Sequence, residues 1–312
     1  MRLDAKRVLK NYGFLIAFIA VCAILSVLSP VFLTRSNILN VVKQSSVFGI
    51  MAVGMTFVIL TGGIDLSVGS ILAFAGAIAA GMLKAGAPIS LVVLASLGIG
   101  AVLGLANGLV ITLGRITPFV TTLAMMSIAR SLTLIYTNGY PISGFHPDFR
   151  FLGGGVLLGI PFPIVVFVAT AILATVILGQ TRLGRYTFAI GGNEEAVRLS
   201  GISSSFYKTM VYVISGLACG LAAVIHTSRL NSAEPVAGTG YELDVIAAVV
   251  IGGTSLNGGR GSVWGTLIGA LLITVINTAM VLLNINPYYS GLVKGLILLG
   301  AVLLDRLRDE TA

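Results

Sequence analysis

The segment Met51–Ser70 reads MAVGMTFVILTGGIDLSVGS and places a single carboxylate, Asp65, between two apolar runs. About 20 predominantly apolar residues are enough for a helix to cross the hydrocarbon core of a membrane. We therefore expect two membrane helices here, joined by a tight turn that contains Gly62 and Gly63. The carboxylate in this turn has three conceivable roles: an ion site within the membrane, a catalytic group, or a structural turn.

The composition excludes a soluble domain. Hydrophobic residues make up 56% of the 312 residues, charged residues make up only 10%, and the mean hydropathy is +1.03. A soluble domain carries about 25% charged residues. Apolar runs recur from Tyr12 to Leu304, and few segments alternate like barrel strands, so we predict an all-α, polytopic membrane protein. The net charge of +8 comes from basic residues scattered near the ends of the runs, which indicates no nucleic-acid partner.

The apolar runs predict about ten transmembrane helices in a single transmembrane domain over residues 1–312. The eighth run is too short for a comfortable crossing, and the tandem glycines beside it favour a broken or re-entrant helix. The predicted spans are 13–33, 45–61, 67–83, 89–113, 117–136, 161–179, 209–227, 242–255, 261–283 and 288–304.

The distribution of lysine and arginine predicts the orientation of these spans. If both chain ends face the cytoplasm, twelve of the 19 basic residues fall in cytoplasmic segments and five in segments on the other side. Basic residues are enriched in cytoplasmic loops, so we expect both termini in the cytoplasm. Two loops are long enough for more than a connection: 137–160 would face outward and about 180–208 would face the cytoplasm.

Small residues recur every four positions along two spans. Such stripes let two helix backbones approach closely in a membrane. We expect them to be packing faces in a compact bundle or at a subunit interface. The stripes are Ser96, Gly100, Gly104 and Gly108, and Gly261, Gly265 and Gly269.

The sequence offers no catalytic, cofactor or metal pattern. It contains no G-x-x-x-x-G-K-[ST] phosphate loop, no H-E-x-x-H pair and no G-x-S-x-G elbow. The two histidines, His146 and His226, lie in an outer loop and at a span end, and the two cysteines have no metal or disulfide spacing. We therefore expect a transporter without an ATPase site of its own, rather than an enzyme, and no cofactor.

Charged residues within the spans are few. Arg130 lies some way down the fifth span, and Lys294 in the tenth is close enough to a span end to extend outward. Ion-driven carriers usually hold charged groups near the middle of the membrane. Neutral polar side chains suit an uncharged polyhydroxy solute better, although Ser and Thr also bind their own helix backbone. The candidate lining of a transport path is Asn107, Thr121, Ser127, Arg130 and Asn277.

The cytoplasmic loop contains a short helix signal, NEEAVRLSG, at residues 193–201. Asn193 is a suitable N-cap, and Glu194 and Glu195 favour the positive end of the helix dipole. Gly201 suits the helix stop. The pattern fits an exposed helix that docks on a partner, and it equally fits an ordinary capped helix in a loop.

The same loop resembles a known motif. Glu195-Ala196-Val197, three residues and Gly201 are similar to the E-A-A-x-x-x-G loop of ATP-binding-cassette (ABC) importer permeases, with Val197 in place of the second alanine. In that family the loop forms a coupling helix that fits a cleft in a separate ATPase subunit. The resemblance assigns this role to Glu194, Glu195, Ala196, Arg198 and Gly201.

Three longer segments make the resemblance more specific. Residues 51–70, 181–202 (TRLGRYTFAIGGNEEAVRLSGI) and 238–271 look like the ribose-type sugar permeases of ABC importers. The resemblance implies the permease fold, a homodimer in membrane lipid, a cytoplasmic ATPase subunit, an external sugar-binding protein and a bacterial inner-membrane location. It also implies that the external protein selects the sugar, so the sequence does not distinguish ribose from other pentoses or hexoses.

Within this family, Asp65 is best interpreted as part of a structural turn. We expect Asp65 or Ser67 to cap the following helix, while Gly62 and Gly63 permit close approach. A role in the gate or in the assembly with the ATPase is the alternative. A second Gly–Gly pair, Gly258 and Gly259, is also followed within a few residues by Ser-Val at the start of a predicted helix. We therefore expect a turn there that corresponds to the turn at Gly62 and Gly63. Two other functions remain open: a secondary sugar carrier driven by an ion gradient, and a permease of the branched-chain amino acid type.

Overall fold

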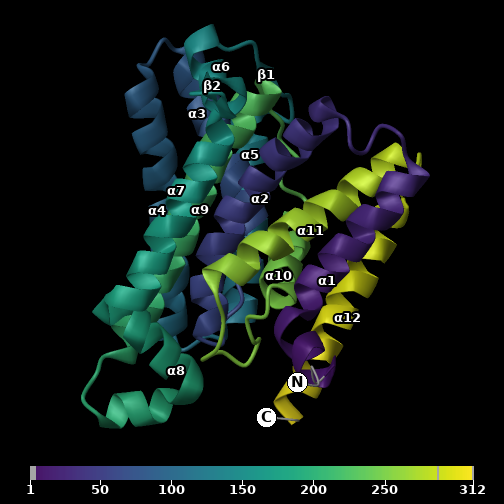
Figure 1. Cartoon of the computed structure of the whole chain (residues 1–312). Helices are drawn as coiled ribbons and strands as arrows, with labels where there is room; N and C mark the ends of the chain where they lie inside the picture. The colour runs from purple at the N-terminus through teal and green to yellow at the C-terminus, as the bar shows by residue number, and fades with distance from the viewer. Residues whose placement is uncertain (1–4, 287, 311–312) are drawn as a thin grey trace.

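The computed structural model describes residues 5–286 and 288–310 (Figure 1). It is almost entirely helical, with four strands of two residues each. The helices are α1 (Ala5–Leu28), α2 (Arg35–Leu60), α3 (Val68–Lys84), α4 (Ile89–Thr112), α5 (Pro118–Thr137), α6 (Pro147–Gly154), α7 (Phe162–Gln180), α8 (Arg182–Leu199), α9 (Ser204–Leu230), α10 (Tyr241–Ile251), α11 (Val263–Leu282) and α12 (Tyr289–Glu310). The strands are β1 (Ile142–Ser143), β2 (Val156–Leu157), β3 (Ile160–Pro161) and β4 (Ser232–Ala233).

Each predicted span coincides with one helix, and the two additional helices, α6 and α8, lie in the two long loops. The largest boundary differences are at the start of the chain, where α1 begins at Ala5 rather than at residue 13 and α2 at Arg35 rather than at residue 45. Helical structure therefore continues past the end of the apolar run. Among the described residues, six helices are long and apolar enough to cross a membrane on their own: α2, α4, α5, α7, α9 and α11.

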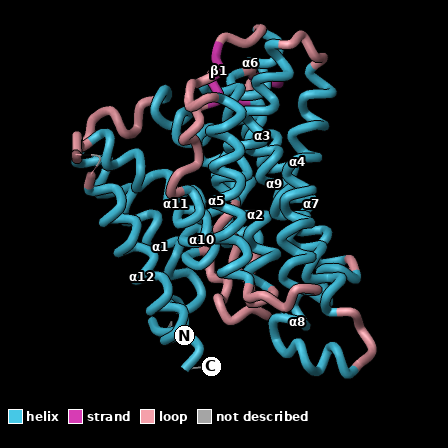
Figure 2. Tube along the Cα trace, turned by 180° about the vertical axis from the view of Figure 1, so that it is seen from behind, coloured by secondary structure: helices cyan, strands magenta, loops and turns pink. Residues whose placement is uncertain are grey.

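The molecule has two distinct ends. Helix α8 lies at one end together with the N-terminal start of α1 and the C-terminal end of α12, and α6 lies at the opposite end (Figures 1 and 2). We refer to them as the α8 end and the α6 end. At the α6 end, β1 pairs with β4 in antiparallel register, so the two loops 138–161 and 231–240 are joined by backbone hydrogen bonds.

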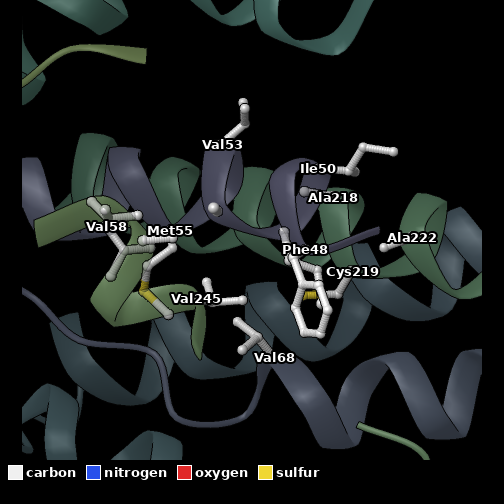
Figure 3. Packing of buried hydrophobic residues seen from close by; sticks show 14 of the residues in the cluster. Phe48, Ile50, Val53, Met55, Val58, Val68, Ala218, Cys219, Ala222 and Val245 are labelled. Carbon is white, nitrogen blue, oxygen red and sulfur yellow. The ribbon is translucent and has the colours of Figure 1, made fainter. Parts of the chain in front are cut away.

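The core forms around α2 and α9. Helix α2 is buried continuously from Ser45 to Leu60, and its apolar side chains meet those of α9, α3 and α10. Figure 3 shows Phe48 and Met55 of α2 in one cluster with Cys219 of α9, Val68 of α3 and Val245 of α10. A helix that is apolar on all sides belongs in the centre of a bundle, which explains the uniform hydrophobicity of the segment around Met51.

Both small-residue stripes pack within the chain. A Cβ at Gly100 or Gly104 of α4 would overlap backbone atoms of α9, and Ser96 donates a hydrogen bond to the carbonyl of Gly220 at 2.8 Å. A Cβ at Gly265 or Gly269 of α11 would overlap the backbone of α10 or of the Gly252 turn. The stripes therefore hold neighbouring helices of one chain together and do not serve as a subunit interface.

Helix α10 is only 11 residues long, or about 16 Å, about half the thickness of a bilayer core. Its first residue, Tyr241, packs against Phe48 with the two rings tilted and their centroids 4.6 Å apart. Phe48 is the fourteenth of the 26 residues of α2, so α10 begins level with the middle of that helix. The expectation of a broken eighth span agrees with this geometry: residues 234–240 complete the crossing without helical structure.

Candidate functional site

The short helix at residues 193–201 has the caps that its sequence predicts. Asn193 interrupts α8 with φ −163° and ψ 96°, and its Oδ1 accepts a hydrogen bond from the backbone N–H of Ala196 at 2.9 Å. At the other end Gly201 has φ +78°, a value that favours glycine, and its N–H donates to the carbonyl of Arg198 at 3.0 Å. We call residues 193–201 the coupling segment.

The coupling segment is exposed and carries charge. Arg198 donates a hydrogen bond to Glu195 at 2.7 Å, which raises the pKa of the Arg198 guanidinium above its ordinary value, and Glu194 forms an ion pair of 3.0 Å with Lys208 at the start of α9. Val197 is buried against the protein, whereas Leu199 is 79% exposed.

The segment lies beside a polar cleft at the α8 end. The cleft has a volume of about 270 Å³ and lies between the α4–α5 connection and the start of α9. Its charged lining residues are Arg115, Glu194 and Lys208, and its hydroxyl groups come from Thr112, Thr117 and Ser205. The exposed helix and this cleft together form a continuous polar surface at the α8 end.

The two glycine turns and α8 meet at one junction just before the coupling segment, and the sequence did not predict this junction. The N–H of Gly259 donates to the carbonyl of Leu60 at 2.9 Å, so the turn after α2 touches the turn before α11. A Cβ at Gly191, two residues before Asn193, would overlap both of these backbone groups. The absence of a side chain at Gly191 thus allows α8 to rest directly on both turns. We call this contact the glycine junction.

Asp65 lies deeper than a surface turn. Its Oδ1 accepts hydrogen bonds from the N–H and the hydroxyl of Ser67, at 3.0 and 2.5 Å, and its Oδ2 accepts from Ser215 of α9 at 2.9 Å. The side chain is fully buried. Ser215 is the twelfth of the 27 residues of α9, so Asp65 lies near the middle of that helix. The connection between α2 and α3 therefore returns into the bundle before α3 starts.

The capping prediction for this turn is wrong. Ser67 is the N-cap residue of α3, but it makes no side-chain bond to the first turn of the helix because its hydroxyl binds Asp65 instead. The amide of Asn107 donates to that same hydroxyl at 2.9 Å. Asp65 and Ser67 thus join the turn to α9 and to α4, and the burial of the carboxylate is balanced by three donors.

The structure does not bring the five candidate path residues together. Asn107 is fully buried in the Asp65 network, and Thr121 is 6% exposed. Asn277 lies across the molecule on α11, where its amide is 3.4 Å from Asp244. Only Ser127 and Arg130 share an open face, on α5.

Lys294 does not extend outward as the sequence suggested. Its ammonium forms an ion pair of 2.7 Å with Asp244, which is 2% exposed and belongs to the first turn of α10. The two residues are 50 positions apart, so local sequence does not reveal that they pair. The ion pair holds α12 against α10. The cost of burying one charge is offset by the other, which explains why both occur in an apolar region.

A match to a protein family shows which family this chain belongs to. Residues 37–302 match the family described as the permease component of the branched-chain amino acid transport system. The chain belongs to this permease family. The match covers the bundle from α2 into α12 and includes the coupling segment, the glycine junction and the Asp65 network.

Curated relatives are similar over nearly the whole chain. The ribose import permease of Bacillus subtilis (strain 168) is 49% identical over 307 residues, which cover 98% of this chain and 95% of the relative. The ribose import permease of Haemophilus influenzae is 50% identical, with coverage of 93% and 91%, and the D-allose transport permease of Escherichia coli (strain K12) is 38% identical, with coverage of 95% and 92%. No solved structure matches the chain.

Proposed function

We propose that this protein is the membrane-spanning subunit of an ABC importer that translocates a sugar, either ribose or a related monosaccharide. The permease family and the similarity to permeases named for ribose and D-allose support the class and the cargo. A separate cytoplasmic ATPase would supply the energy, since this sequence contains no phosphate-binding loop. An external binding protein would deliver the sugar.

The observation that carries the proposal is the glycine junction, where Gly191, two residues before the coupling segment, packs on both turns. The exposed residues Glu195, Arg198 and Leu199 would dock on the ATPase, together with the adjacent polar cleft. A displacement of the segment would act on the turns at Leu60 and Gly259 through the close backbone packing at Gly191. Packed interfaces of this kind move as units rather than deform gradually.

These two turns lead to two shortened helices. The turn after Leu60 runs to Asp65 and the start of α3, and the turn that contains Gly259 follows the end of α10. Interrupted helices whose ends lie within the bilayer are typical of transport sites. Movement at the α8 end would therefore change the positions of α3 and α10 and switch the side on which the path is open.

The α6 end is suited to receive the binding protein. Strand pairing joins its two loops, and Asn231 accepts a hydrogen bond from the N–H of Phe145 at 2.9 Å. Ser228 donates to the carbonyl of Phe149 at 2.6 Å, so α6 is fixed on the end of α9. A rigid surface of this kind can recognise a partner without the ordering cost of a flexible loop.

The remaining parts of the proposal concern the assembly. Two copies of the permease would form a homodimer in the bacterial inner membrane, with the α8 end and both termini in the cytoplasm. The excess of basic residues in the segments at that end supports this orientation. The polar cleft and the charged coupling segment at the α8 end are consistent with a cytoplasmic, protein-binding surface.

Gentle purification from the native membrane through an affinity tag tests the function. We expect an ABC ATPase to copurify in a fixed ratio, and we expect D-ribose uptake to require that ATPase and the binding protein. A chain that purifies alone and moves sugar when reconstituted alone would instead be a secondary carrier. Titration of the binding protein with different monosaccharides would then identify the cargo.

A further inference from the structure

The non-helical segment 234–240 enters the bundle from the α6 end and stops at the first turn of α3. A Cβ at Gly69 would overlap the carbonyl oxygen of Gly238, so the segment is pressed against the start of α3. From there the chain turns into α10 at Tyr241, level with the middle of α2. Two interrupted crossings therefore meet deep in the molecule.

Arg130 of α5 holds the segment in place. Its Nη1 donates hydrogen bonds to the carbonyl oxygens of Pro235 and Ala237, at 2.9 and 2.7 Å. Glu242, in the first turn of α10, lies near enough for its charge to attract that of Arg130. Within the part of the chain that the structure describes, Arg130 and Glu242 do not form a direct ion pair. The side chains of Arg130 and Glu242 are only partly buried, so both can contact solvent or a solute.

Hydroxyl groups surround these two charges. Ser127 and Ser131 of α5 are exposed, and so is Thr239 in the segment that Arg130 holds. Ser127 is the tenth of the 20 residues of α5, which places it half-way along the helix. We call Ser127, Arg130, Ser131, Thr239 and Glu242 the polar face.

A lipid environment does not explain the two charges of the polar face. The hydroxyl groups of Ser127 and Thr239 donate to carbonyl oxygens of their own chain, but charges within a membrane almost always face the bundle interior or a water-filled cavity. Large apolar side chains are exposed on α5 as they are on α4 and α7, since Ile128 and Ile135 are 51% and 72% exposed. Water at the polar face is therefore inferred from its two charges, Arg130 and Glu242.

We propose that the polar face lines the path of the sugar half-way through the membrane and contacts it by hydrogen bonds. The inference rests on the proposed function, and it adds the residues that the sugar passes. An uncharged polyhydroxy solute can form hydrogen bonds with the three hydroxyl groups, with the Arg130 guanidinium and with the Glu242 carboxylate.

Cysteine accessibility tests the environment of the polar face without any sugar. The background is the complete importer, with Cys22 and Cys219 replaced by alanine and with insertion of the permease and its binding to the ATPase first shown to persist. We expect a membrane-impermeant thiol reagent to modify Ser127→Cys and Ser131→Cys at least tenfold faster than Leu173→Cys, the matched lipid-facing control. Rates for both serine positions no higher than for Leu173→Cys would overturn the inference.

Transport by Glu242→Gln tests the contact with sugar. We expect D-ribose uptake to fall at least tenfold while the loaded binding protein still stimulates ATP hydrolysis, because docking and coupling lie elsewhere. The matched control is Glu242→Asp, which keeps a carboxylate at this position and should retain more of the D-ribose uptake than Glu242→Gln. Uptake by Glu242→Gln within twofold of wild type would overturn the sugar contact. Failure of the wild type to move D-ribose would instead count against the proposed cargo, and the thiol rates would still decide the path.

Discussion

Substitution of Gly191 by alanine tests the glycine junction. The added Cβ would overlap the carbonyl oxygen of Leu60 and the amide nitrogen of Gly259, which are backbone atoms and cannot rotate away. Overpacking of this kind costs about 1–3 kcal/mol. If the cost acts on the closed contact between α8 and the two turns, the population of that contact falls about 5- to 140-fold.

The next residue provides a matched control. A Cβ at Gly192 would have no heavy atom within 4 Å, so Gly192→Ala adds the same methyl group without a clash. The assay is uptake of radiolabelled D-ribose by membranes with equal amounts of inserted permease and bound ATPase. We expect at least fivefold lower uptake for Gly191→Ala and a change below twofold for Gly192→Ala.

Two results would refute this reasoning. Equal uptake by the two variants would show that the junction does not transmit movement. Loss of the inserted Gly191→Ala protein itself would show that the contact is needed for folding rather than for coupling.

Three further predictions concern other contacts. Gly201→Pro should abolish uptake but leave the protein inserted, because proline fixes φ near −65° where the structure has +78° and removes the N–H that binds Arg198; normal uptake would remove the coupling role. Asp65→Ala should lower the thermal stability of the detergent-solubilised protein far more than Asp65→Asn, since each buried donor left unpaired costs about 1–3 kcal/mol, and equal melting temperatures for the two variants would contradict this. Asp244→Asn should cost about 3–5 kcal/mol by leaving Lys294 without its partner, and the addition of Lys294→Met should restore part of the melting temperature; no recovery in the double variant would argue against the ion pair.

The sequence predicted the helices well because membrane spans have a strong local signal. Each of the ten predicted apolar runs coincides with a helix, six of these helices are long and apolar enough to cross a membrane, and the short eighth run corresponds to the short helix α10. The caps at Asn193 and Gly201 were also predictable, because a cap depends on residues within one turn of the helix.

The contacts between distant segments were not predictable from local patterns. Asp65 was placed at a span end because it follows an apolar run, but the chain returns into the bundle, where Ser215 binds the carboxylate. Lys294 was expected to extend outward because it lies close to a span end, but its partner Asp244 is 50 positions away in the sequence. Gly191 gave no signal, since its role is the absence of a side chain at a place where three backbone segments meet.

Transport by purified components measures the central claim most directly. Proteoliposomes would contain this permease with its ATPase, ATP on the α8 side, and the binding protein loaded with radiolabelled D-ribose on the α6 side. We expect sugar to accumulate only when permease, ATPase, binding protein and ATP are all present, and to stop when any one of them is omitted. Accumulation by the permease alone under an ion gradient would contradict the assignment as an ABC importer subunit.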